Sequence, residues 1–234
     1  MDKPIAWSHS ALESFETCPH KHYRTRIIKD VEVNWDNEPA KWGREVHAAM
    51  DRRLRIKAKL PTNMEMYEQH AAKLEAVAKI TGMEIKTELQ LAITQQLQPC
   101  NWKDWNHCWA RAAIDVGLLH PEQPEAMVWD WKTGKRKTGA ETDQQLAICA
   151  LMIFLHYPHV HRVHSGYLWL VEGAADRMTF TRDSMKAILG VVLPKVRALT
   201  DAHLNGDWPT RPSGLCQKYC EVHDCKFNGA YKAP

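Results

Sequence analysis

The sequence reads Ala113-Ile114-Asp115 and then, fifteen positions after that aspartate, Asp130-Trp131-Lys132-Thr133-Gly134. Both stretches read as extended segments, and residues i and i+2 of a strand point to one face, so Asp130 and Lys132 would converge. Asp115 would reach the same spot from the neighbouring strand. Two carboxylates can hold a hard divalent cation, and a lysine beside them can orient or activate an attacking water. This pattern indicates a metal-dependent phosphodiesterase site.

Length and composition are those of an ordinary globular protein. The chain has 234 residues, 44% hydrophobic and 25% charged, which suffices for one large domain over residues 1–234. The longest apolar run, Leu146 to Leu155, is too short to cross a bilayer, so we expect no membrane partner. The first residues, Met1-Asp2-Lys3-Pro4, lack an apolar signal region, and this favours a bacterial cytoplasm, or a host cytoplasm if the chain is phage-encoded.

Two basic patches stand out against a net charge of only +3. The patch over 52–57 is interpreted as a solvated helix surface. The patch over 132–137 begins at the candidate catalytic lysine and could touch a phosphate backbone.

Hydrophobic periodicity predicts helices in the first third of the chain and mixed elements after it. Ser10 to Glu13 has the pattern of a capping box that opens a short helix, and a second helical stretch follows Cys18-Pro19 through Ile27. Further helices are expected over 43–57, and from a cap at Thr62 to Gly82. Alternation then predicts strands over 89–93, 105–118 and 126–131, a buried helix over 142–157, strands over 163–171 and 177–181, and a helix over 183–204 bent at Pro194. The order favours an α/β core flanked by helices.

Several motifs lie in one order along nearly the whole chain: Ser8 to Leu12, Phe15 to Pro19, Trp42-Gly43 to His47, Ala113 to Asp115, Asp130 to Gly134, and Gln145-Leu146. Together they resemble the PD-(D/E)XK nuclease superfamily. Within it they resemble the RecB-like branch, which includes CRISPR-adaptation and phage exonucleases. The resemblance implies a restriction-endonuclease-like mixed central sheet flanked by helices.

The same resemblance implies roles for individual residues. His47, Asp115 and Asp130 would ligate Mg²⁺ or Mn²⁺, assisted by the main-chain carbonyl of Trp131. Lys132 would position the water, and Gln145 would steady the lysine or contact nucleic acid. Two positions depart from the family pattern: Cys149 replaces the aromatic of Q-x-x-x-Y, and Ala113-Ile114 replaces the more usual Gly-x-Ile before the first acid.

Each candidate also has a structural interpretation. His47 shares a helical face with Met50 and Leu54 and could be a core histidine. Asp130 could be a turn residue, and Gln145 a capping-box partner of Thr142. Glu88 could be an accessory acid near the metal, although a solvent-facing glutamate is the commoner case.

Seven cysteines in a chain without an export signal favour metal ligands or buried thiols over disulfides. Cys100, Cys108 and Cys149 sit among apolar neighbours and are expected in the core. Cys216, Cys220 and Cys225 crowd the C-terminus, and the resemblance implies that Cys18 joins them around a 4Fe–4S cluster, in a lobe of residues 1–30 and 206–234. Their x3 spacing departs from the common x2. Zinc is the alternative, with His20 or His223 replacing a cysteine, and reduced thiols without metal are a third possibility.

The function expected from the resemblance is metal-dependent hydrolysis of DNA phosphodiester bonds. An exonuclease in recombination, repair or phage DNA processing is the leading version. No G-x-x-x-x-G-K-[ST] motif occurs, so a helicase or recombination partner would be a separate protein, and a homo-oligomer is an open possibility. The alternatives are a non-catalytic nucleic-acid-binding or assembly module of the same fold, and a zinc-stapled binding protein of another fold.

Overall fold

The computed structural model describes residues 5–33, 37–136 and 143–232, and its centre is a six-stranded sheet in the order β2-β1-β3-β4-β5-β6. The strands are β1 Glu84–Ile93, β2 Pro99–Cys100, β3 Ala110–Leu119, β4 Glu125–Lys132, β5 Arg162–Trp169 and β6 Ala174–Thr181. Four of the pairings are antiparallel, and β4 pairs with β5 in parallel. The mixed sheet with flanking helices confirms the predicted fold class.

The parallel pair requires a crossover, and the helix α5, Asp143–His156, provides it. Its residues are almost all buried between Leu146 and Phe154, as expected for a helix against a sheet. The crossover places Asp130 of β4 beside Tyr167 of β5 in the register of the two strands.

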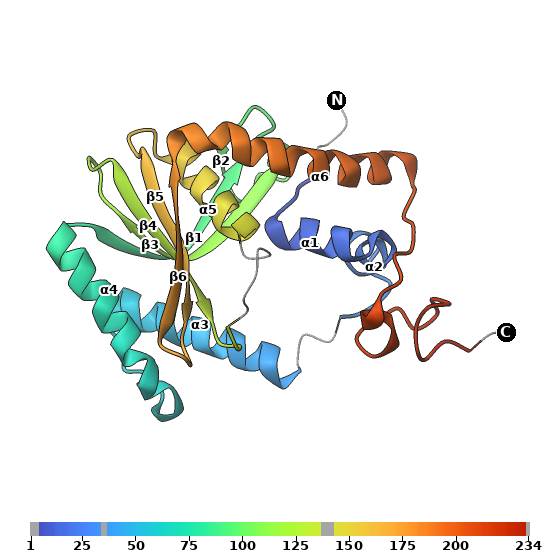
Figure 1. Cartoon of the computed structure of the whole chain (residues 1–234), viewed down its shortest axis with the longest axis horizontal. Coiled ribbons are helices and arrows are strands. Elements are labelled where there is room, and N and C mark those ends of the chain that lie inside the picture. Colours follow the sequence, from blue (N-terminus) through green and yellow to red (C-terminus); the bar gives the residue numbers. More distant parts are fainter. Residues whose placement is uncertain (1–4, 34–36, 137–142, 233–234) are drawn as a thin grey trace. The chain divides into compact units, whose positions relative to one another are not determined.

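The helices α3, Glu38–Ile56, and α4, Glu68–Thr81, pack together against β1 and share one apolar core with β3 and β4 (Figure 1). A 3-10 helix, Thr62–Tyr67, joins them. The start of α3 is fixed by Asn37, whose side-chain oxygen accepts a hydrogen bond from the Ala40 backbone N at 3.0 Å. The buried stripe of α3 includes Val46, Ala49 and Met50. Because this stripe packs on the sheet, it fixes the position of the neighbouring His47 beside the sheet.

The chain divides into two compact units. The first is built mainly from Asn37–Leu189 and contains the sheet. The second combines Trp7–Asp36 with Gly190–Pro234. The boundary falls within α6, Met185–Asn205, which follows a 3-10 turn, Arg182–Ser184.

The second unit joins segments from both ends of the sequence. It contains α1 His9–Thr17, α2 Pro19–His22, a π-helical turn Tyr23–Ile27, most of α6, and a 3-10 helix Gly214–Gln217. Trp208 stacks on Tyr23 and on His22, with ring centroids 5.1 Å and 6.1 Å away. The Lys195 ammonium pairs with the Glu16 carboxylate at 2.9 Å. An aromatic cluster and an ion pair thus tie the two segments together within this unit.

Several predicted helix starts were wrong. Ser8, not Ser10, caps α1, since its hydroxyl accepts a hydrogen bond from the Ala11 backbone N. Thr62 begins a 3-10 helix without a side-chain cap, and α3 starts at Glu38 rather than at 43 because Asn37 caps it. The predicted stop at Gly82 holds: this glycine adopts φ +71 at the end of α4.

The strand boundaries also differ from the prediction. β3 begins at Ala110 rather than 105, because the Asp104 carboxylate accepts backbone hydrogen bonds from Asn106 and His107 and holds that stretch in a turn. The two-residue strand β2 was not predicted, since so short a segment carries no alternation. Three of the sequence predictions lie outside the described residues. They concern the proposed cap at Thr142, the end of the second basic patch at Lys137, and the first residues, Met1 to Pro4. No helix of the described part is both long enough and apolar enough to cross a bilayer.

Candidate metal-binding and catalytic site

Asp115 stands where β3 and β4 stop pairing. The last paired residues are Val116 of β3 and Trp129 of β4, and Asp115 is the residue of β3 just beyond this pair. Its Oδ2 accepts a hydrogen bond from the backbone N of Trp131 at 2.7 Å, and its Oδ1 lies 3.3 Å from Nδ1 of His47. The carboxylate therefore bridges the opening between the two strands to helix α3.

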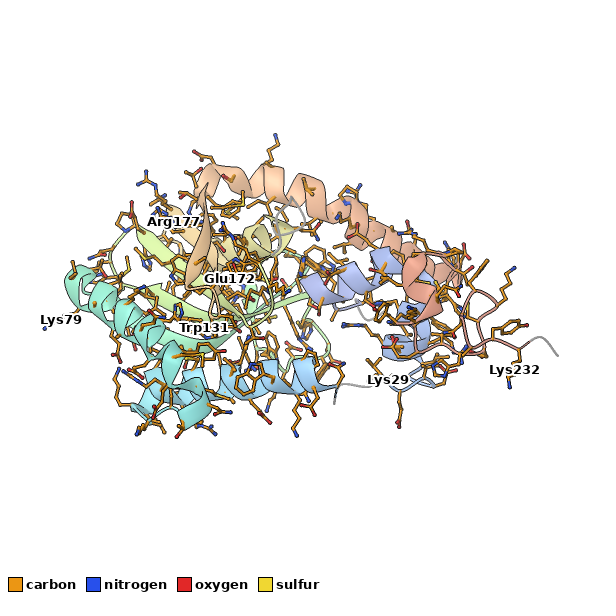
Figure 2. The ribbon with its side chains drawn as sticks, turned by 60° about the horizontal axis from the view of Figure 1, so that its bottom comes forward. Lys29, Lys79, Trp131, Glu172, Arg177 and Lys232 are labelled. Carbon is orange, nitrogen blue, oxygen red and sulfur yellow. The ribbon has the colours of Figure 1, made fainter. Side chains whose placement is uncertain are left out.

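His47 contacts the same opening through both ring nitrogens. Its Nε2 lies 3.1 Å from the carbonyl oxygen of Trp131, which Figure 2 labels in the sheet beside α3. Burial alone would lower the pKa of His47, but the hydrogen bond to Asp115 and the charges of Asp115, Asp130 and Glu88 outweigh it and raise the pKa. The imidazole thus lies among anionic oxygen atoms rather than within the apolar stripe of α3.

Glu88 completes a group of potential ligands. It lies opposite Asp115, between the paired residues Thr87–Val116 and Leu89–Ile114, and its φ of +49 is unusual for a strand. Ligand atoms of His47, Glu88 and Asp115 all fall within 4.8 Å of one another, and no other group of three in the described chain does so. Desolvation and the negative charge of Asp115 raise the pKa of Glu88. Glu88 is exposed, as expected, and it also lies at the candidate metal site.

Lys132 and Gln145 form a second cluster around Asp130. The Lys132 ammonium lies 2.7 Å from Asp130 Oδ2, and the Gln145 amide donates to Asp130 Oδ1 at 2.6 Å. The ammonium also donates to Gln145 Oε1 at 3.4 Å. Burial and the charge of Asp115 raise the pKa of Asp130, against the opposite effect of Lys132. Asp130 is therefore held by the lysine and the glutamine, outside the group of three ligands formed by His47, Glu88 and Asp115.

Tyr167 belongs to the same cluster and was missed in the sequence. Its hydroxyl donates to Gln145 Oε1 at 3.2 Å, and the Lys132 ammonium lies 4.7 Å from the centre of its ring. This aromatic side chain comes from β5, whereas Cys149 of α5 stands at the aromatic position of the Q-x-x-x-Y motif. The only signal in the sequence is a tyrosine inside an apolar strand, which does not reveal that a parallel neighbour will place it beside Asp130.

Cys149 is buried in α5, and burial raises the pKa of its thiol. Cys108 is buried and Cys100 half-buried, and none of the seven cysteines forms a disulfide. Cys100, Cys108 and Cys149 were all expected in the core, and of these Cys108 and Cys149 are buried.

The other four cysteines lie in the second unit, where Cys18, Cys216, Cys220 and Cys225 line one pocket. Backbone N–H groups of Lys21 and Arg211 donate to the Cys18 sulfur at 3.5 Å and 3.4 Å. Burial raises the pKa of Cys220. Cys18 is therefore a neighbour of the three late cysteines in space, although no three of these described sulfurs fall within 4.8 Å of one another.

Comparison with protein families matches residues 6–225 to the PD-(D/E)XK nuclease superfamily. No curated protein matches the sequence. Among solved structures, a presumed exonuclease from Eubacterium rectale is similar at a TM-score of 0.52, with 12% identity over 92% of this chain and 86% of that one. The protein SSO0001 aligns at a TM-score of 0.46, with 15% identity over 94% and 84%.

Proposed function

The chain belongs to the PD-(D/E)XK nuclease superfamily, and from this premise we propose that it is an Mg²⁺- or Mn²⁺-dependent deoxyribonuclease that acts as an exonuclease. The observation that carries the proposal is the convergence of His47, Glu88 and Asp115 beside a buried acid–lysine pair. The resemblance to the RecB-like branch supports the exonuclease role. It also supports a place in recombination, repair or phage DNA processing, with any helicase or recombination protein as a separate partner and a homo-oligomer as one possible assembly.

The donor set fits a hard divalent cation. Carboxylates of Asp115 and Glu88, an imidazole nitrogen of His47 and the carbonyl of Trp131 meet at one opening, and oxygen ligands dominate the set. The closeness of three acids also leaves repulsion that a cation would relieve, since Asp115 raises the pKa of both Glu88 and Asp130. Asp130 would join the metal by exchanging its contact with Lys132. When bound, the ion would activate water and neutralise charge on the phosphate.

Lys132 would orient the attacking water and stabilise the phosphate in the transition state. Without metal, Asp130 and Gln145 contact its ammonium from two sides and the Tyr167 ring lies on a third. When Asp130 turns to the metal, Gln145 and Tyr167 would keep the ammonium in place. A group already oriented costs little reorganisation when charge develops, which is the main advantage of such a site. Gln145 then acts as a positioning residue for both the lysine and Asp130.

We further propose that Cys18, Cys216, Cys220 and Cys225 hold a 4Fe–4S cluster. Four cysteines on one pocket with N–H donors to sulfur suit such a cluster. A tetrahedral zinc with bonds of about 2.3 Å needs sulfurs within roughly 4 Å of one another. No three of these described sulfurs fall within 4.8 Å, so their arrangement here is wider than a zinc site requires.

The test is digestion of end-labelled single- and double-stranded DNA by anaerobically purified protein, with Mg²⁺, with Mn²⁺ and with chelator. Wild type should digest DNA only with metal, and Lys132→Ala should lose cleavage while still binding DNA. Lys79→Ala, an exposed lysine on α4 (Figure 2), is the matched control and should cleave normally. DNA retention without digestion under any metal would instead favour the non-catalytic binding module.

A further inference from the structure

A cationic aromatic stack forms where the loop of residues 101–109 leads into β3. The guanidinium carbon of Arg111 is 4.1 Å from the ring centre of Trp105 and 5.5 Å from that of Trp102. Trp105 is nevertheless 59% exposed, an unusual state for the largest apolar side chain. One face of this ring is therefore supported by an arginine while much of the remainder is open to solvent.

The stack is held in place by its own loop. Arg111 Nε donates to the Cys108 sulfur at 3.1 Å, and Cys108 is buried. The Asp104 carboxylate accepts backbone hydrogen bonds from Asn106 and His107 and fixes the turn that carries Trp105. A ring positioned in advance loses little conformational entropy when a flat partner stacks on it.

An uncovered strip of sheet links the stack to the candidate metal site. Arg111, Ala113 and Asp115 are at alternating positions of β3, so they belong to one face, and the separation from Arg111 to Asp115 along the strand is about 13 Å. On β1, Gln90 pairs with Ala113, and Glu88 lies opposite Asp115. Ala113, Gln90 and Glu88 are all exposed, although β1 and β3 are interior strands of the sheet.

The chemistry of this surface selects one kind of partner. A flat aromatic ring backed by a guanidinium stacks with nucleobases, and Arg111 and Lys103 supply positive charge for a phosphate backbone. In a duplex the base faces are already stacked, so only a single strand can offer them. We propose that Trp105, supported by Arg111, stacks a base of single-stranded nucleic acid whose backbone runs along the Gln90–Ala113 strip to the metal site.

This inference rests on the proposed nuclease function and adds a strand preference to it. The substrate would be engaged as a single strand, with a stacked base a few nucleotides from the phosphate to be cleaved. Aromatic side chains stack on every base, so this surface would determine the preference for single strands and the binding affinity rather than sequence specificity.

The experiment measures binding of a fluorescently labelled oligothymidylate in chelator, where no cleavage can occur. Trp105→Ala should weaken binding about 5- to 150-fold, because base–aromatic stacking contributes on the order of 1–3 kcal/mol. Trp105→Tyr keeps an aromatic face and should retain most of the affinity, so this variant separates stacking from misfolding. Ile80→Ala removes an apolar side chain of α4 that is even more exposed, at 84%, and this variant should bind as wild type does.

Quenching of 2-aminopurine placed at successive positions of the same strand should be lost in Trp105→Ala alone. Unchanged affinity and quenching in Trp105→Ala would overturn the stacking surface, even if the wild type digests DNA with metal. Conversely, binding that depends on Trp105 in a protein that never cleaves would support the surface and refute only the nuclease proposal. The two failures are therefore distinguishable.

Discussion

At the scale of single residues, Gln145 is the centre of the candidate catalytic cluster. Its amide oxygen receives hydrogen bonds from Lys132 and Tyr167, and its amide nitrogen donates to Asp130. One side chain thus sets the relative positions of three others from two neighbouring strands, β4 and β5. We expect the cluster to be sensitive to small changes, because each hydrogen bond fixes a group that has a role in the proposed reaction.

Tyr167→Phe should lower kcat about 2- to 10-fold with little change in KM, since one hydrogen bond of about 0.5–1.5 kcal/mol is lost while the ring beneath Lys132 remains. Tyr167→Ala should lower kcat further. Steady-state kinetics on labelled DNA measures both effects. Tyr231→Phe, on an exposed tyrosine, serves as the control, and a change confined to KM would argue against a positioning role for Tyr167.

Glu88→Gln should have opposite effects on metal binding and on stability. The substitution removes an anionic ligand and should weaken Mn²⁺ binding in titration calorimetry. It also removes repulsion between Glu88 and Asp115, so the metal-free protein should unfold at a higher temperature. Glu84→Gln, an exposed glutamate of the same strand, should change neither property. Unaltered Mn²⁺ affinity would remove Glu88 from the site.

At the scale of elements, the sequence was sufficient to predict the strands and helices whose apolar side chains recur at regular intervals. The strands that carry Asp115 and Asp130 were predicted, because alternation and the D-x-K spacing agree there. The position of Tyr167 beside Lys132 was not predicted, because it depends on which strand pairs with β4 in parallel. Glu88 was ambiguous because its backbone conformation, with φ of +49, cannot be inferred from an alternating pattern.

Gly166→Ala tests the packing of that parallel strand. A Cβ at Gly166 would press on the carbonyl oxygen of Asp176 and lie 2.6 Å from the Trp129 ring, so we expect a loss of about 1–3 kcal/mol or more in unfolding free energy. Gly190→Ala is the opposite case: a Cβ there meets nothing within 4 Å and lies inside α6. It should gain about 1 kcal/mol from helix propensity. Denaturant titration of both variants checks the two signs, and equal effects would contradict this packing.

At the scale of the whole molecule, the two compact units contain different chemical groups, so we expect their stabilities to depend on different conditions. The sheet unit contains the candidate metal site, whereas the second unit contains the four-cysteine pocket and an aromatic cluster around Trp208. Neither pocket nor cluster could be predicted from local pattern alone, because each combines segments from opposite ends of the sequence. The resemblance to the RecB-like branch nevertheless implied that these four cysteines lie together.

The second unit should lose stability as pH falls from about 6.5 to about 4. Burial and then the charge of Arg26 lower the pKa of His22 to about 4, so the unfolded chain takes up a proton before the folded one does. The loss should reach up to about 3 kcal/mol. His22→Phe keeps a ring on Trp208 and should flatten the dependence of melting temperature on pH in calorimetry. An identical pH profile in His22→Phe and wild type would exclude His22 as the cause, and exposed His107→Asn is the control.

Cys216→Ser should bleach the visible absorbance of the anaerobically purified protein and lower its melting temperature, since ligation would contribute to folding of the second unit. Cys100→Ser, on a half-buried cysteine outside this pocket, should leave the spectrum unchanged. If the wild-type protein is colourless and contains one equivalent of zinc, the pocket binds zinc and not an iron–sulfur cluster.

The composition of the second unit has a consequence for synthesis of the protein. Cys18 leaves the ribosome well before its partners, because Cys216 follows it by 198 residues. At about 5–20 residues per second, that interval is on the order of 10–40 seconds. The segment 37–189 is complete before the last cysteine exists, so the sheet unit can fold while Cys18 is still unpartnered. Insertion of the proposed cluster would then have to wait until Cys225 has left the ribosome.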